Sequence, residues 1–150
     1  MTATSDISRF YRDTVLMHSR DPQNFGVLDP VDASSSRHNA LCGDEVSVYL
    51  RMTPAGDIAD ARFSGQGCAI SMASASIMTS LIVGATRTGA TELARNFEEY
   101  LSHGVAWTPP PALAAIAEVR AYPARVRCAL LPWLTLVDAL SREKRVAERC

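Results

Sequence analysis

The sequence predicts an α+β fold in which a small antiparallel sheet packs against several helices. Apolar residues recur at helical spacing near the start, alternate with polar residues between 46 and 63, and return to helical segments after residue 70. Strands followed by a run of helices are typical of this class, and we expect a third strand to join the hairpin. At 150 residues the chain can bury a core without disulfides, so we expect residues 1–150 to form a single domain.

A helix and then a long loop are predicted before residue 41. Ser5 can cap the helix and Asp21-Pro22 can end it, because the residue before a proline disfavours helical backbone. The apolar positions at helical spacing are Ile7, Phe10, Tyr11, Val15 and Leu16. Residues 21–40 are rich in Pro, Asp, Ser and Asn without periodicity, which predicts a surface loop leading to Cys42.

A β-hairpin is predicted next. Residues 53–57, which include Pro54 and Gly56, supply the turn between two segments that alternate with period two. The residues expected to face inward are Val46, Val48, Leu50 and Met52 in the first strand, and Ala59, Ala61 and Phe63 in the second. Because a hairpin returns to where it began, Cys42 and Cys68 should lie near each other.

Helical segments are predicted over 71–83, 91–101, 112–119 and about 129–145. The small and apolar residues of the first predict a buried, tightly packed helix, and its serines are expected to allow close packing rather than to act in catalysis. Pro132 is acceptable only in the first turn of a helix. This places Cys128 at the N-terminus of the last helix.

Composition excludes several classes of function. The net charge is −1, from 15 basic and 16 acidic residues, and provides no basic field to attract nucleic acid or an anionic membrane. The N-terminus lacks the pattern of a signal peptide, and no stretch reaches the roughly 18 apolar residues of a membrane span. We therefore expect a cytoplasmic protein, in which cysteines favour metal binding or thiol chemistry over disulfides.

The segment Cys42-Gly43-Asp44 sets a thiol and a carboxylate two residues apart, so in an extended chain both can point to one side. Gly43 lets the backbone bend between them. With Cys68 and Cys128 they would complete a tetrahedral metal site whose soft sulfur ligands favour zinc or iron-sulfur chemistry. Asp is a harder and more exchangeable ligand than Cys or His, which suggests a labile site.

Two features would stabilise thiolates at this site. Cys68 and Cys128 are both predicted just before helices, where backbone N–H groups and the macrodipole favour negative charge. Arg125 or Arg127 can offset part of the excess negative charge of three thiolates and a carboxylate around one metal ion, and Arg127 is the residue that we expect to tune the site.

Five segments resemble the IscU/NifU family of iron-sulfur scaffold proteins, from about residue 8 to 140: Cys42-Gly43-Asp44, residues 65–79 around Cys68, residues 125–133 around Cys128, Tyr11-Arg12, and Asp21–Gly26. The SufU branch fits best. Scaffolds of the IscU type have a histidine before the third cysteine where this chain has Arg127, and the segment between Cys68 and Cys128 is longer here than theirs. The resemblance implies an IscU-like fold.

The resemblance also implies a function. Cys42, Asp44, Cys68 and Cys128 would bind zinc, and Cys42 would accept persulfide sulfur from a cysteine desulfurase of the SufS type when a histidine of that enzyme replaces it on the metal. Sulfur would then pass to downstream iron-sulfur assembly proteins. The protein would thus be a sulfur acceptor rather than a stand-alone enzyme, as a monomer or weak dimer.

Three alternatives stay open from the residues. The same ligands can hold a transient [2Fe-2S] cluster, because both sites are tetrahedral and rich in thiolates. The second alternative is a structural zinc site, which only stabilises the fold of a module that binds a partner. The third is a thiol hydrolase, in which His38 or His103 would act as base for Cys42. Cys150 is expected to be a free terminal thiol.

Overall fold

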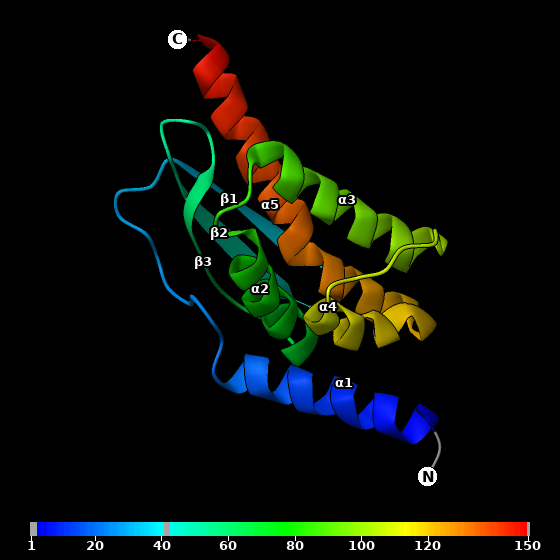
Figure 1. Ribbon diagram of the computed structural model, residues 1–150. Coiled ribbons are helices and arrows are strands. Elements are labelled where there is room, and N and C mark those ends of the chain that lie inside the picture. Colours follow the sequence, from blue (N-terminus) through cyan, green and yellow to red (C-terminus); the bar gives the residue numbers. More distant parts are fainter. Residues whose placement is uncertain (1–2, 41–42, 150) are drawn as a thin grey trace.

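The computed structural model describes the backbone of residues 3–40 and 43–149, and the side chains of residues 9–40 and 43–141. In chain order its elements are α1 Ala3–Arg20, β1 Ala33–Asn39, β2 Asp44–Met52, β3 Ile58–Gln66, α2 Ala69–Ile82, α3 Arg87–His103, α4 Pro111–Ile116, the 3-10 helix η1 Ala117–Ala121, and α5 Pro123–Arg149. The predicted α+β fold is confirmed (Figure 1).

The sheet is antiparallel with strand order β1-β2-β3. The predicted hairpin forms β2 and β3, and the residues 46, 48 and 50 on its inner face are fully buried. The prediction for the second strand was partly wrong, because Ile58 is buried and Ala59 is exposed. A register shift between Arg51 and Met52 changes which residues at the start of β3 face inward.

The third strand lies where the sequence predicted a loop. β1 pairs along its whole length with β2, from Ala33 opposite Leu50 to Asn39 opposite Asp44. Its alternation is hidden because the inward positions are small, with Ala33 and Ser35 buried, and the rest of the strand is mostly exposed. A cross-strand bond between the hydroxyls of Ser36 and Ser47, 2.6 Å apart, adds to the pairing.

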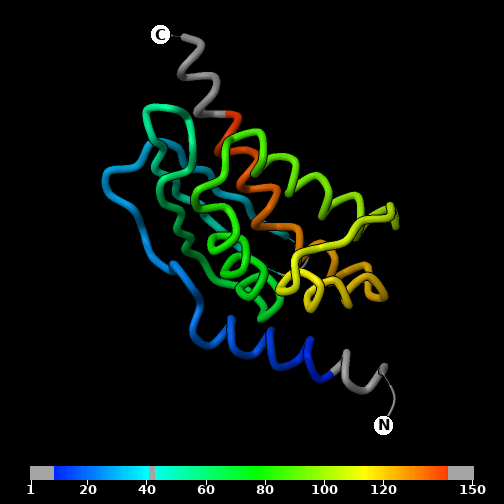
Figure 2. The backbone as a smooth tube through the Cα atoms, in the orientation of Figure 1, coloured from blue at the N-terminus to red at the C-terminus, as the bar shows by residue number. Residues whose placement is uncertain are grey.

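Two central helices cover one face of the sheet, and further helices cover them (Figure 1). α5 packs against β1 and β2, and α2 packs against β3. α1 lies against α2, and α3 lies against α5. The segment between α1 and β1 runs along the sheet edge (Figure 2), where Phe25 forms an isolated bridge with Phe63 of β3.

α1 is only partly anchored by the apolar residues that predicted it. Val15 is buried, whereas Phe10 is 50% and Leu16 is 39% exposed. α1 packs against α2 and α4 and lies outside the sheet layers, so only a narrow stripe of the helix is covered. Among the described residues, no helix combines the length and apolarity needed to cross a membrane.

Two helices begin about a turn or more earlier than predicted. α3 starts at Arg87 rather than residue 91, because the Thr86 hydroxyl accepts a hydrogen bond from the N–H of Gly89 and caps the helix. α5 starts at Pro123 rather than about residue 129, so Cys128 lies in its second turn and not at its N-terminus. The helix macrodipole can therefore favour a thiolate at Cys68, the N-cap of α2, but the prediction that it does so at Cys128 was wrong.

Pro132 lies inside α5, where the sequence predicted that it could not. It has no N–H to donate to the Cys128 carbonyl one turn earlier. Two serines of α2 reach this part of α5 instead: the Ser71 hydroxyl lies 3.1 Å from the Cys128 carbonyl oxygen, and Ser74 donates to the Ala129 carbonyl at 2.6 Å. The Ser71 hydroxyl thus lies beside the carbonyl that the proline leaves without its helical donor.

Candidate metal centre

Asp44, the first residue of β2, is held at the end of the sheet and is 1% exposed. Its Oδ1 accepts a hydrogen bond from the backbone N–H of Cys68 at 2.8 Å, and its Oδ2 accepts one from the Ser71 hydroxyl at 2.7 Å. Gly67 makes room for it, since a Cβ atom there would lie 2.6 Å from Oδ1. The carboxylate is therefore fixed through both oxygens.

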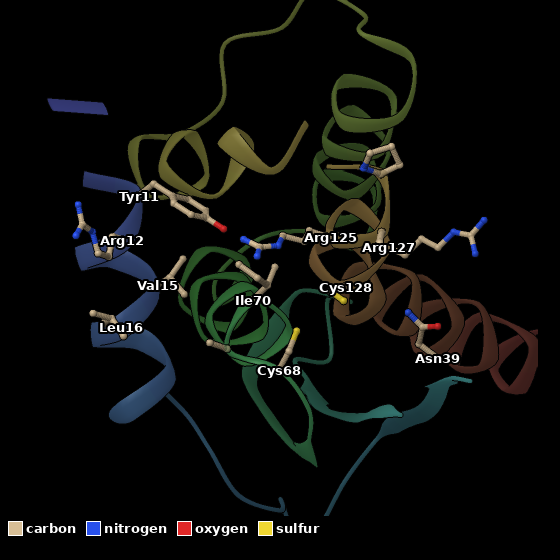
Figure 3. A pocket seen from close by; sticks show the side chains of 13 residues that line it. Tyr11, Arg12, Val15, Leu16, Asn39, Cys68, Ile70, Arg125, Arg127 and Cys128 are labelled. Carbon is tan, nitrogen blue, oxygen red and sulfur yellow. The ribbon is translucent and has the colours of Figure 1, made fainter. Parts of the chain in front are cut away.

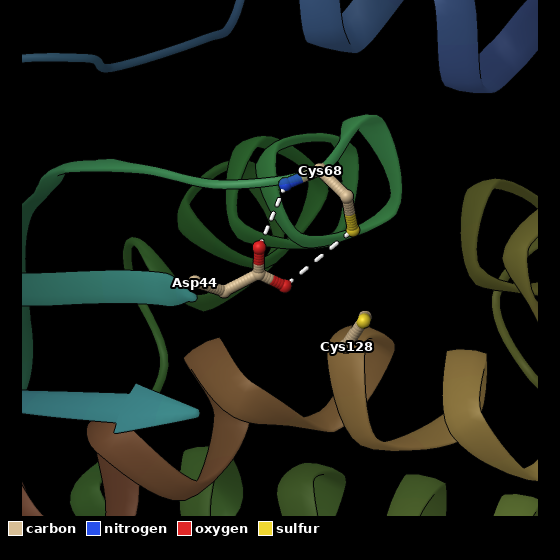
Figure 4. A group of neighbouring side chains, drawn as sticks. All are labelled: Asp44, Cys68 and Cys128. Atoms are coloured by element: carbon tan, nitrogen blue, oxygen red, sulfur yellow. Dashed lines mark hydrogen bonds between the residues drawn. The ribbon is translucent and has the colours of Figure 1, made fainter. Parts of the chain in front are cut away.

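The thiols of Cys68 and Cys128 lie beside this carboxylate (Figure 4). The ligand atoms of Asp44, Cys68 and Cys128 are all within 4.8 Å of one another. Cys68 comes from the start of α2 and Cys128, 6% exposed, from the second turn of α5. The structure thus brings together three of the four residues that the sequence singled out as metal ligands.

The three donors suit a zinc ion. Zn–S bonds of about 2.3 Å and Zn–O bonds of about 2.0 Å in a tetrahedron place neighbouring sulfur and oxygen ligands about 3.5 Å apart. The Cys68 Sγ atom lies 3.5 Å from Asp44 Oδ2. Two soft sulfurs and one carboxylate oxygen also exclude the oxygen-rich coordination that magnesium and calcium prefer.

Cys42 lies outside the described residues, as does Cys150. Its role as a fourth ligand therefore stays a prediction. The predicted bend at Gly43 is confirmed, because its φ is +70° and its N–H donates to the Asn39 carbonyl at 2.8 Å. β1 ends at Asn39 and β2 begins at Asp44.

A cavity of about 690 Å³ adjoins the two thiols, which form part of its lining (Figure 3). Val15 and Leu16 of α1 and Ile70 of α2 give it apolar walls. Tyr11 and Arg125, which also line it, are joined by a side-chain hydrogen bond. Burial raises the pKa of Tyr11, and this hydrogen bond partly opposes the rise. The thiols therefore adjoin a mainly apolar cavity whose lining also contains Arg12, Arg125 and Arg127.

Arg127, predicted to tune the site, is exposed and extends away from Cys128 (Figure 3). Arg125 is also exposed, and its side chain is directed toward Tyr11 (Figure 3); both arginines belong to the cavity lining. The role of Arg127 stays a prediction.

The histidines do not decide the hydrolase alternative. His38 on β1 and His103 at the end of α3 are both exposed, and their distances to Cys42 lie outside what the structure describes. His18 contacts the Ser76 hydroxyl at 2.7 Å. The hydrolase hypothesis stays untested.

Sequence reasoning missed Ser71 and Gly67, which both contact Asp44. Ser71 follows Cys68 by three residues, and this spacing places two residues on one face of a helix. That spacing is a usable signal, but Ser71 is one of many small residues in a helix whose composition indicates close packing. No sequence pattern marks Gly67, because the close approach of Asp44 arises only when β2 meets the start of α2.

Comparison with known proteins covers most of the chain. The family model of the NifU-like N-terminal domain matches residues 10–128. The chain is 32% identical over 148 residues to the zinc-dependent sulfurtransferase SufU of Bacillus subtilis, covering 96% of this chain and 98% of that protein. It is 33% identical over 137 residues to the iron-sulfur cluster assembly scaffold protein IscU of Thermotoga maritima, covering 90% and 95%. The crystal structure of FiSufU from Fervidobacterium islandicum AW-1 superposes with a TM-score of 0.81 at 33% identity, covering 88% of this chain and 97% of that one.

Proposed function

Since the chain belongs to the NifU-like N-terminal domain family, we propose that it is an iron-sulfur cluster assembly protein that accepts persulfide sulfur from a cysteine desulfurase of the SufS type. Cys42, Asp44, Cys68 and Cys128 would hold zinc, and Cys42 would be the sulfur-accepting thiolate. The observation that carries the proposal is the buried Asp44 carboxylate, fixed between the thiols of Cys68 and Cys128.

The described residues suit separate tasks at such a site. Zinc, when bound, would keep its thiolate ligands deprotonated at neutral pH. Asp44 at the start of β2, Cys68 at the N-cap of α2 and Cys128 in α5 are held by packed elements, which suits ligands that stay on the metal. In the proposal Cys42 is the remaining thiolate, and it receives the sulfur.

The cavity supports access by a partner. Cys68 and Cys128 line it, so a sulfur donor on a protein loop has a route to the site that does not require unfolding. The Arg125 side chain in the cavity would favour a donor group that carries negative charge, such as a persulfide. Which protein supplies the sulfur is part of the proposal.

A second function uses the same residues. The 33% identity to a protein named as an IscU scaffold favours a transient [2Fe-2S] cluster, carried as cargo, on the same ligands. Metal analysis and visible absorption of freshly purified protein separate the two. One zinc per chain without colour supports sulfur acceptance, and iron with visible absorption bands supports the scaffold.

Replacing the proposed acceptor tests the function. We expect Cys42→Ala to abolish the stimulation of SufS-dependent sulfide release and to leave the melting temperature close to that of the wild type. Cys150→Ala is the matched control, because it removes a thiol that the proposal does not use, and it should retain full stimulation. Full activity of Cys42→Ala would refute the acceptor role and favour the structural zinc site.

A further inference from the structure

We propose that Ser71 is a positioning residue of the metal site, which holds the Asp44 carboxylate so that Asp44 stays bound when another ligand exchanges. This inference rests on the proposed metal site. Ser71 is 0% exposed in the first turn of α2, and its hydroxyl oxygen is 2.7 Å from Asp44 Oδ2 and 3.7 Å from Cys68 Sγ. Its side chain thus touches two of the proposed ligands.

The Ser71 hydroxyl has one hydrogen and two acceptors within reach. Asp44 Oδ2 at 2.7 Å is closer than the Cys128 carbonyl oxygen at 3.1 Å. A hydrogen bond to a charged acceptor is shorter and roughly twice as strong as a neutral one. The hydrogen is therefore directed to the carboxylate, and the Cys128 carbonyl receives the weaker branch of a three-centre bond.

Two donors to Asp44 act on different oxygens. The N–H of Cys68 donates to Oδ1 and the Ser71 hydroxyl donates to Oδ2, and both donors belong to the start of α2. Together they oppose rotation of the carboxylate about its Cβ–Cγ bond. The Cys68 Sγ atom lies 3.5 Å from the same Oδ2, so this oxygen is held facing a thiol.

This arrangement explains how a carboxylate can serve as a lasting ligand. Carboxylates are harder and more exchangeable zinc ligands than thiolates. Partners that bind and orient a ligand contribute about 10- to 100-fold to metal affinity. With Ser71 in place, Asp44 need not reorder each time the site opens at its fourth ligand.

The alternative is a purely structural role, in which the Ser71 hydroxyl only links α2 to α5 through the Cys128 carbonyl. Ser74, one turn later, has that role: its hydroxyl donates to the Ala129 carbonyl at 2.6 Å and accepts from Trp133 Nε1 at 3.1 Å. Ser74 is also 0% exposed. Ser74→Ala is therefore a matched control, which removes a buried hydroxyl from the same helix and leaves both donors to Asp44 in place.

The test compares full-length wild type, Ser71→Ala and Ser74→Ala, each loaded with Zn²⁺ or Co²⁺ alone. We expect Ser71→Ala to lower the zinc affinity about 10- to 100-fold in competition with a chelator, and to shift the visible absorption bands of bound Co²⁺. Ser74→Ala should keep the wild-type affinity and spectrum, even where its melting temperature falls by a similar amount. In an Asp44→Ala background, adding Ser71→Ala should cause no further loss of affinity.

Each outcome separates this inference from the proposed function. If Asp44→Ala weakens zinc binding but Ser71→Ala has wild-type affinity and spectrum, the positioning role is wrong and the metal site stands. Equal losses from Ser71→Ala and Ser74→Ala also overturn it, because they indicate a general effect of the helix contact. If Asp44→Ala, Cys68→Ala and Cys128→Ala all bind zinc like the wild type, the proposed site itself fails.

Discussion

Gly67→Ala probes the close approach of β2 to the start of α2 by adding one methyl group. The new Cβ atom would lie 2.6 Å from Asp44 Oδ1 and 2.8 Å from its Cγ, well inside the 3.4 Å at which ordinary contact begins. The backbone of Gly67 lies outside the left-handed region, so alanine is otherwise allowed there. The closest clashes therefore all involve the Asp44 side chain, whose carboxylate must turn away from the N–H of Cys68 or push α2 outward.

The expected magnitude follows from two opposing effects. Overpacking by a methyl group costs about 1–3 kcal/mol, and replacing glycine by alanine returns about 0.4–1 kcal/mol by restricting the unfolded chain. The balance is a destabilisation of about 1–2 kcal/mol. For a chain of this size we expect a fall in melting temperature of about 2–8 °C and a zinc affinity about 10- to 100-fold lower.

Thermal denaturation of metal-free protein and chelator competition measure the two effects. The control is Gly67→Ala combined with Asp44→Ala, which removes Oδ1 and Cγ and leaves only the Asp44 Cβ contact of 3.0 Å. The penalty of the alanine should shrink in that background. The reasoning is refuted if Gly67→Ala alone is as stable as the wild type and binds zinc equally well.

Two further predictions concern contacts away from the metal centre. Burial lowers the pKa of His18 from its usual 6.5, so the unfolded chain binds a proton more readily and the free energy of unfolding should fall as the pH drops below about 6.5. The decrease of the free energy of unfolding with falling pH should be smaller in His18→Gln than in the wild type. An identical pH profile of the melting temperature in both proteins would contradict this prediction. Arg37 and Asp138 form an ion pair of 2.6 Å with side chains 43% and 36% exposed. A double-mutant cycle in denaturant should give a coupling of about 0.2–1 kcal/mol that decreases with salt, and a coupling insensitive to salt would count against this.

Local patterns were sufficient for the elements that dominate the core. Alternation over residues 46–63 predicted the β2–β3 hairpin, and the run of small residues predicted that α2 is buried. The hairpin also predicted that the segments before β2 and after β3 meet, and the bond from the N–H of Cys68 to Asp44 confirms it. These features depend on neighbours in sequence or on a single turn.

The wrong predictions concern segments whose structure depends on contacts with residues far away in the sequence. β1 has little alternation of its own and is a strand because it pairs with the edge of β2 and α5 packs against it. Pro132 predicted a late start for α5, yet the helix continues through it with hydroxyls of α2 beside the carbonyls of Cys128 and Ala129. Neither partner is visible in the local sequence.

The sequence by itself predicted which residues form the metal site: the thiols of Cys42, Cys68 and Cys128 and the carboxylate of Asp44. Only the tertiary structure decided how the carboxylate is held, because its donors Cys68 and Ser71 come from the start of α2, more than 20 residues along the chain. It also placed Cys128 inside α5 rather than at its end. A ligand set can be recognised from residue types and spacing, whereas the orientation of each ligand depends on hydrogen bonds that form only when the sheet and the two central helices pack together.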